Sequence, residues 1–218
     1  MRSDLPNVEA VLFDMDGTLV DSDASVRRAW ADWCGEYGVA VTVADAFVRG
    51  SSAEEGIRQA FPELGAGSLA ERVARFLEFE CADVTDVVPM PGALALLARL
   101  GALGIPWAIV TSAERPLAEL RLKAAGVVAE TVVTIDDVTA CKPDPEGYLL
   151  AARTLAVEIS RCLVVEDSVP GVTAGRAAGA TVASLRGVAS DLPLRDLFHL
   201  ADLLPAAGNA EFFRIAES

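Results

Sequence analysis

Histidine is almost absent from this sequence: among 218 residues it occurs once, at His199. The surrounding segment LRDLFHLADLL is typical of a helix, so we expect His199 to be a partly buried residue near a helix end. One histidine leaves almost no room for a Ser-His-Asp or Cys-His active site, or for a multi-histidine metal site. Any catalysis therefore has to use carboxylates, hydroxyl groups and lysine.

Paired cysteines and long apolar runs are also lacking. The cysteines at positions 34, 81, 141 and 162 form no CxxC pair, which disfavours a zinc site and fits reduced thiols. The apolar runs are far shorter than a membrane span, and the N-terminal segment MRSDLPNVEA lacks the apolar centre of a signal peptide. We therefore expect a cytoplasmic protein with no membrane partner.

Positive charge is scarce as well. The chain has 18 Lys and Arg against 32 Asp and Glu, a net charge of −14 at pH 7. Nucleic-acid binding requires clustered Lys and Arg, so we expect no nucleic-acid partner. An anionic substrate would be repelled by the overall field unless a local positive site attracted it, which points to a metal ion.

The stretch VLFDMDGTLVDS is the most informative in the chain. An apolar run that ends at Phe13 is followed by Asp14 and Asp16, and Gly17 supplies a permissive backbone for a turn. On a strand, residues two apart share a face, so both carboxylates can point at one bound group. Two such charges are costly together unless a cation joins them or one is protonated. The alternative is an acidic strand-to-loop junction, because Asp and Gly are common turn residues.

Strand and helix patterns alternate in the second half of the chain. Strand patterns occur at residues 105–110, 131–135, 162–165 and 181–185, with helix patterns at 93–103, 116–125, 145–154 and up to 178. This alternation predicts an α/β fold with a doubly wound parallel sheet. With 52% hydrophobic residues, the chain can bury one large domain, or a domain with an insertion.

Residues 21–87 read as the insertion, a small helical cap within a Rossmann-like core formed by residues 1–20 and 88–218. Asp21 or Ser22 can cap a first helix, on which Trp30 and Trp33 lie at core-facing spacing, and Gly38 ends it. Further helix patterns follow at 43–48, 53–61 and 69–81, and residues 84–92 resemble a return linker.

Polar residues follow the later strands. Thr111 and Ser112 end the strand at 105–110, Lys142 precedes a helix, and Glu166 with Asp167 ends the strand at 162–165. The carboxyl ends of parallel strands meet at one edge, so these groups should converge near Asp14. There Mg²⁺ could be held by Asp14 and Asp167, with Lys142 and Thr111 assisting phosphoryl transfer. Taken singly, each of these later motifs could be an ordinary cap or surface group.

The four motifs in this order, DMDGT, TS, KPDP and VVEDS, resemble those of the haloacid dehalogenase superfamily, in its β-phosphoglucomutase-like branch. The resemblance covers nearly the whole chain, and it implies Asp14 as nucleophile and Asp16 as general acid/base, with the Asp16 backbone carbonyl also on the metal. It further implies phosphate binding by Thr111, Ser112 and Lys142, metal binding by Glu166 and Asp167, and substrate contacts from the cap segment Arg49, Gly50 and Ser51. Arg49 could equally be an ordinary surface arginine.

Within that branch, IPWAIVTS, the tryptophan pair and KPDPEGYLLAA are most similar to bacterial sugar-phosphate phosphatases. A sugar phosphomutase is the alternative, but related mutases often carry a small apolar residue where Thr18 stands and a histidine where Val26 stands. A dehalogenase would need neither Asp16 nor a metal, and a non-catalytic binding protein should have lost a charged site residue. The expected partner is a small phosphorylated metabolite, and the expected state is a monomer or weak homodimer.

Overall fold

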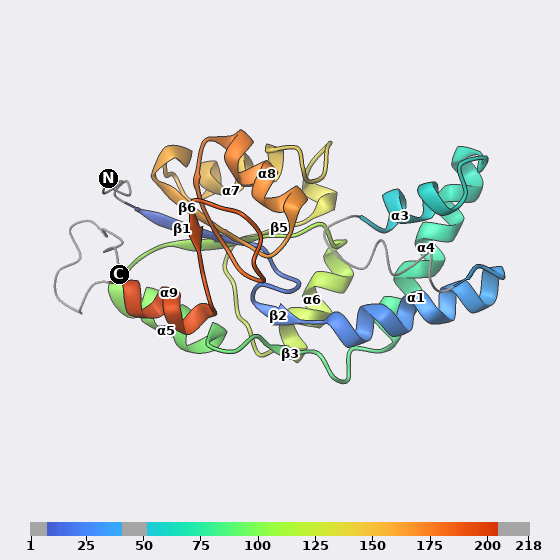
Figure 1. Cartoon of the computed structure of the whole chain (residues 1–218), viewed down its shortest axis with the longest axis horizontal. Coiled ribbons are helices and arrows are strands. Elements are labelled where there is room, and N and C mark those ends of the chain that lie inside the picture. Colours follow the sequence, from blue (N-terminus) through green and yellow to red (C-terminus); the bar gives the residue numbers. More distant parts are fainter. Residues whose placement is uncertain (1–7, 41–51, 205–218) are drawn as a thin grey trace.

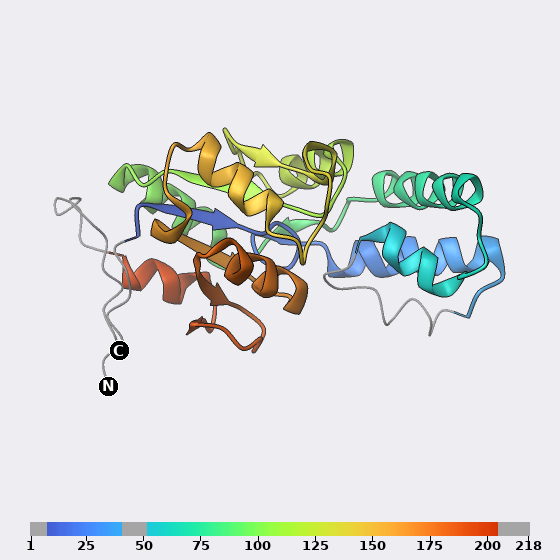
Figure 2. The same cartoon turned by 90° about the horizontal axis from the view of Figure 1, so that it is seen from above.

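The computed structural model describes residues 8–40 and 52–204. A central sheet with helices on both faces forms the larger part, and a helical lobe extends from one end of it (Figures 1 and 2). None of the helices in these ranges is both long and apolar enough to cross a membrane. The predicted α/β class with an attached helical region is therefore confirmed.

The sheet has six parallel strands in the order β5-β4-β1-β6-β7-β8. Its strands are β1 (Ala10–Phe13), β4 (Trp107–Val110), β5 (Val132–Val133), β6 (Cys162–Glu166), β7 (Thr181–Ser184) and β8 (Leu192–Pro193). The predicted parallel, doubly wound sheet is confirmed, whereas β8 was not predicted because two residues show no alternation. The chain runs outward from β1 to β5 and then returns to β6 on the other side of β1. Ligands bind in open α/β sheets at such reversals, outside the carboxyl ends of the strands.

Alternate residues of β1 face opposite layers. Val11 and Phe13 belong to the same apolar cluster as α5 (Ala93–Leu103), α6 (Arg115–Ala124) and α9 (Leu197–Leu203). Ala10 and Leu12 pack with α7 (Glu146–Thr154) and α8 (Val169–Ala178) on the other face. All four strand residues are fully buried, and each large aliphatic side chain so buried stabilises the fold by roughly 1.5–3 kcal/mol. This two-sided burial explains why β1 reads as a continuous apolar run.

Several predicted helix boundaries agree with the structure. The helix α5 occupies 93–103 as predicted and ends at Gly104, whose φ of 67° is the left-handed conformation that favours glycine. Asp144 Oδ1 accepts the Glu146 N–H at 2.9 Å, but the N-cap of α7 is Pro145 and not Asp144, so the helix begins one residue later than predicted. His199 lies half-buried on α9, as expected. Single 3₁₀ turns at Ile135–Asp137 and Ile159–Arg161 complete this part.

In the described residues the helical lobe contains α1 (Asp23–Tyr37), α3 (Ala53–Ala60) and α4 (Ala66–Ala82). Trp30 and Trp33 are buried in its centre, with the Trp30 and Phe76 rings 4.1 Å apart, so the prediction of core-facing tryptophans is confirmed. Gly38 ends α1 as predicted. The predicted helix at 43–48 lies outside the described residues, and the division into a core and a cap at residues 21–87 stays a prediction.

The chain enters and leaves the helical lobe through two short paired strands. In β2 (Val20–Asp21) and β3 (Val88–Pro89), Val20 lies opposite Pro89 and Asp21 opposite Val88, in antiparallel register. The segment 84–92 was predicted as a return linker, and the strand within it was not predicted because two residues are too short to be recognised from sequence. The pairing fixes both crossing segments beside the end of β1, next to the candidate site.

Candidate active site

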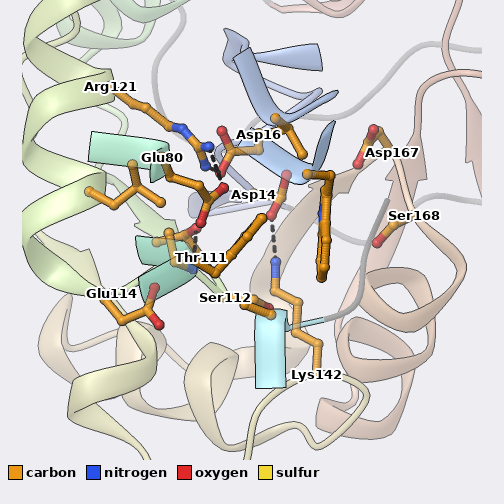
Figure 3. Close-up of a pocket in the computed structure, with 16 residues that line it drawn as sticks. Asp14, Asp16, Glu80, Thr111, Ser112, Glu114, Arg121, Lys142, Asp167 and Ser168 are labelled. Carbon is orange, nitrogen blue, oxygen red and sulfur yellow. Dashed lines mark hydrogen bonds and ion pairs between the residues drawn. The ribbon is translucent and has the colours of Figure 1, made fainter. Parts of the chain in front are cut away.

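The predicted motif residues converge at the carboxyl edge of the sheet. Residues from the loops after β1, β4 and β6 and before α7 line one pocket, as Figure 3 shows: Asp14, Asp16, Thr111, Ser112, Lys142 and Asp167. Glu166 does not line the pocket; it is fully buried and accepts a hydrogen bond from Lys142, which does. The predicted cap residues Arg49, Gly50 and Ser51 lie outside the described residues.

Lys142 is the centre of the charge network. Its side chain is 7% exposed, and its Nζ donates to Asp14 Oδ1 at 2.6 Å, to Glu166 Oε1 at 2.7 Å and to the Val110 carbonyl at 2.9 Å. Burial alone would lower the pKa of Lys142, but the carboxylates of Asp14 and Glu166 raise it above its usual value. Lys142 is therefore a permanent ammonium whose three protons all have acceptors within the protein.

The backbone positions Asp14, and one of its two carboxylate oxygens has a hydrogen-bond partner among the described residues whereas the other has none. Its N–H donates to the Val165 carbonyl at 2.9 Å, and its side chain is almost completely buried. Its Oδ1 accepts from Lys142, whereas Oδ2 is buried and has no hydrogen-bond partner among residues 8–40 and 52–204. Burial, opposed by Lys142 and reinforced by Glu166 and Asp167, raises the pKa of Asp14 well above its usual range. An additional cation at Oδ2 would stabilise the ionised form.

Glu166 acts as an anchor for the network. Its Oε1 accepts from Lys142 and from the Tyr148 hydroxyl at 2.6 Å, while Oε2 accepts from the Ser168 hydroxyl at 3.0 Å and from two backbone N–H groups. The carboxylate also needs Gly171, because a Cβ there would stand 1.8 Å from Oε1. Tyr148 and Ser168 were not predicted as site residues, although Tyr148 lies in the segment KPDPEGYLLAA and Ser168 in VVEDS.

Asp167 faces the pocket and is held from outside by an arginine. Its Oδ2 lies 3.2 Å from Arg186 Nε, and Arg186 Nη1 donates to Asp23 at the start of α1 at 2.7 Å. Gly17 allows this approach: its φ is +82°, and a Cβ there would lie 2.1 Å from Asp167 Oδ2. Burial and the neighbouring Glu166 raise the pKa of Asp167 to about 6, against the opposing effects of Arg186 and Lys142.

The carboxylates fit a hard divalent cation. Asp14, Glu166 and Asp167 each bring one oxygen within 4.8 Å of the others. Oxygen ligands are those that Mg²⁺ prefers, and the unpartnered Oδ2 of Asp14 is the kind of buried atom that a metal would satisfy. Because both oxygens of Glu166 already accept hydrogen bonds, Asp14 and Asp167 are the better placed direct ligands.

Asp16 is oriented by groups that were not predicted as part of the site. Its Oδ1 accepts from the Ser22 hydroxyl at 2.6 Å, and its Oδ2 accepts from Arg121 Nη1 at 3.0 Å. Ser22 does precede α1, as predicted for a cap, but it makes no side-chain cap bond there. Arg121 Nη2 in turn donates to Glu80 of α4 at 2.8 Å.

The remaining pocket walls come from both parts of the molecule. Thr111 follows β4, and its hydroxyl oxygen accepts the Ala113 N–H at 3.1 Å, which leaves the hydroxyl proton for a ligand. Val26, Trp30 and Phe76 of the helical lobe supply apolar lining, and Glu114 of the core also lines the pocket. The pocket therefore combines a charged floor with an apolar side.

Comparison with known proteins agrees with this arrangement. A model of the haloacid dehalogenase-like hydrolases matches residues 8–179. Hexitol phosphatase A from Escherichia coli is 40% identical over 187 residues, which cover 85% of this chain and 87% of that protein. Fructose-1-phosphate phosphatase YqaB, also from Escherichia coli, is 30% identical and covers 81% of this chain and 95% of its own length. A solved hydrolase from Pseudomonas syringae superposes with a TM-score of 0.80 at 27% identity, over 90% of this chain and 97% of that chain.

The chain belongs to the haloacid dehalogenase-like hydrolase family. Within that family it is a phosphatase, that is, a phosphoric monoester hydrolase, and both expectations from the sequence are confirmed. The family and the enzyme class rest on these comparisons, with which the fold and the motifs agree.

Proposed function

We propose that this enzyme hydrolyses the phosphate monoester of a small sugar or polyol, with Mg²⁺ as cofactor and an aspartyl phosphate on Asp14 as intermediate. The observation that carries the proposal is the state of the Asp14 carboxylate. One oxygen is held by a buried ammonium, and the other is buried without a partner among the described residues, beside Asp167. A carboxylate held in this way is fixed in orientation, with Oδ2 left for the Mg²⁺ proposed here.

Phosphate recognition uses the groups around Asp14. Thr111 and Ser112 present hydroxyl groups to the pocket, and Lys142 supplies positive charge from below, while its own protons stay on protein acceptors. Asp14 and Asp167 would hold Mg²⁺, with the Asp16 carbonyl as a further ligand and Glu166 acting through water. When bound, Mg²⁺ supplies the positive charge that offsets the carboxylates and the phosphate oxygens.

The reaction proceeds in two displacements. The step starts with Asp16 protonated: Asp14 attacks phosphorus, its oxygen forms a bond to the phosphoryl group, and the bond to the substrate oxygen breaks as Asp16 gives its proton to that oxygen. The sugar or polyol then leaves as an alcohol. In the second step Asp16 takes a proton from water, the water oxygen attacks phosphorus, and the bond to Asp14 breaks. Inorganic phosphate leaves, and both aspartates return to their starting states.

The substrate class is supported by the pocket and by the relatives. Relatives named hexitol phosphatase and fructose-1-phosphate phosphatase span most of this chain. Trp30 and Phe76 offer apolar surface to the carbon skeleton, and Glu114 offers an acceptor to hydroxyl groups. The predicted contacts from Arg49, Gly50 and Ser51 would complete this side of the site.

Hydrolysis is favoured over a phosphomutase reaction by Val26. This apolar side chain lines the pocket at the position where related mutases carry a histidine. Without a histidine at this position, the aspartyl phosphate has less protection from water, so transfer of the phosphoryl group to water is the expected outcome.

The proposal is tested by phosphate release from hexitol phosphates, fructose 1-phosphate, β-glucose 1-phosphate and nucleotide monophosphates, with and without Mg²⁺. We expect metal-dependent release that is fastest with a sugar or polyol phosphate, and its loss in Asp14→Asn. Asp32→Asn, a matched change at an exposed position on α1, should leave the rate unchanged. Turnover by folded Asp14→Asn would refute the nucleophile, and glucose 6-phosphate formation without phosphate release would identify a mutase.

A further inference from the structure

Arg121 is a buried arginine that belongs to none of the four motifs. It lies on α6, is 3% exposed, and its guanidinium stands between two carboxylates from different parts of the fold (Figure 3). Nη1 donates to Asp16 Oδ2 at 3.0 Å, and Nη2 donates to Glu80 Oε1 at 2.8 Å. Asp16 follows β1 in the core, whereas Glu80 lies on α4 in the helical lobe. One side chain thus joins the proposed acid/base residue to the lobe.

The two bonds of Arg121 depend on each other. A buried guanidinium is stable only while carboxylates or other acceptors surround it. Glu80 is 6% exposed, and α4 packs against α6, so the pair is formed inside the contact between the lobe and the core. A shift of α4 away from α6 would separate Glu80 from Arg121. The guanidinium would then be paired with Asp16 alone, and the position of Asp16 would change with it.

Asp16 is held from both ends of the lobe. Its second oxygen accepts from Ser22, the residue immediately before α1, and Glu80 lies near the end of α4, just before the chain returns to the core. One oxygen of Asp16 is therefore bonded to a residue at the start of the lobe, and the other to Arg121 of the core, which is itself paired with the lobe through Glu80. In Figure 3 the Asp16 carboxylate is directed toward Arg121, whereas Asp14 is directed toward Lys142.

We infer that Arg121 is a positioning residue for Asp16, and that its bond to Glu80 makes the placement of Asp16 depend on the position of α4. The inference rests on the proposed function, in which Asp16 donates a proton to the leaving oxygen and later accepts one from water. Proton transfer requires hydrogen-bond reach, so a carboxylate held in the wrong place loses this function while binding of the phosphate group remains.

The test compares two substrates that differ in their need for that proton. β-Glycerol phosphate has an alcohol leaving group that must be protonated, whereas 4-nitrophenolate leaves 4-nitrophenyl phosphate without a proton. The ratio of their kcat/KM values reports the first displacement alone, because the aspartyl phosphate and its hydrolysis are common to both. Asp16→Asn is the internal standard and should lower the ratio strongly.

We expect Arg121→Lys, and the double variant Arg121→Met with Glu80→Gln, to lower kcat/KM for glycerol phosphate about tenfold or more beyond any loss with the aryl phosphate. The double variant removes the carboxylate that Arg121→Met alone would leave buried, so a folded protein remains available. Glu80→Gln alone should lower the ratio by a smaller factor. Arg115→Met, on the same helix but paired with Asp137 outside the pocket, should leave the ratio unchanged.

The outcomes test three claims separately: the acid/base role of Asp16, the positioning role of Arg121 and the dependence on α4. If Asp16→Asn leaves the ratio at the wild-type value, the acid/base role in the proposed function is wrong. If Asp16→Asn lowers the ratio but folded Arg121 variants do not, the positioning role of Arg121 is refuted. If only Glu80→Gln leaves the ratio unchanged, the dependence on α4 is refuted. Melting curves by circular dichroism establish that each variant is folded at the assay temperature.

Discussion

Removal of the Tyr148 hydroxyl tests whether the charge network is anchored as the structure indicates. In Tyr148→Phe, Glu166 Oε1 loses a donor at 2.6 Å but keeps Lys142, and both Tyr148 and Glu166 are fully buried. Burial, Glu166 and Asp14 raise the pKa of Tyr148, so the phenol is protonated and donates at every accessible pH. The change therefore removes one hydrogen bond to a charged acceptor and strands no charge.

Such a bond contributes about 1.5–3 kcal/mol to the free energy of unfolding. For a chain of 218 residues, each kcal/mol lost from the free energy of unfolding lowers the melting temperature by roughly 2–4 °C. A loss near 2 kcal/mol therefore lowers the melting temperature by about 4–8 °C. Urea and thermal denaturation followed by far-ultraviolet circular dichroism measure both quantities. Tyr37→Phe is the matched control, because it removes the same atom from a half-buried ring at the end of α1. A Tyr148→Phe variant within about 0.5 kcal/mol of this control would refute the anchoring argument.

Two further outcomes follow from burial in the site. Gly171→Ala should abolish activity and lower the melting temperature, because its Cβ would overlap the Glu166 carboxylate. Gly67→Ala is the control: it lies on α4, where a Cβ meets nothing within 4 Å, and should raise the free energy of unfolding by about 0.5–1 kcal/mol. Burial, opposed by Arg121, raises the pKa of Glu80 to about 7. A raised pKa means that the contribution of Glu80 to stability is present below its usual pKa and is lost as pH rises toward 7. Urea midpoints of Glu80→Gln should therefore vary less than wild type between pH 5 and 8, and parallel profiles would contradict this.

The sheet and the charged floor could be predicted because their signals are local. β1 is apolar at every position, since both faces are covered, and Asp14 follows it directly. Glycines such as Gly38 and Gly104 end helices through their own backbone conformation. Each of these features depends on a few adjacent residues, so a single sequence is sufficient to identify it.

The partners of Asp16 could not be predicted, because their contacts are distant in the sequence. Arg121 is 105 residues from Asp16 and 41 from Glu80, and no spacing rule joins such positions. The sequence does contain one sign: Arg121 stands between Leu117 and Leu122 on the buried side of α6, where a charged residue needs a partner. That sign indicates a buried ion pair without identifying its other members.

The antiparallel pairing of Val20 with Pro89 has a consequence for how such enzymes diversify. A segment whose two ends meet as neighbouring strands can be lengthened, shortened or exchanged without altering the strand order of the sheet that carries it. The prediction that residues 21–87 select the substrate then implies that substrate preference can change through the helical lobe, while Asp14, Lys142 and Asp167 stay on the unaltered framework. A graft that joins the core at residues 21 and 88 would be the natural unit for transferring specificity between relatives.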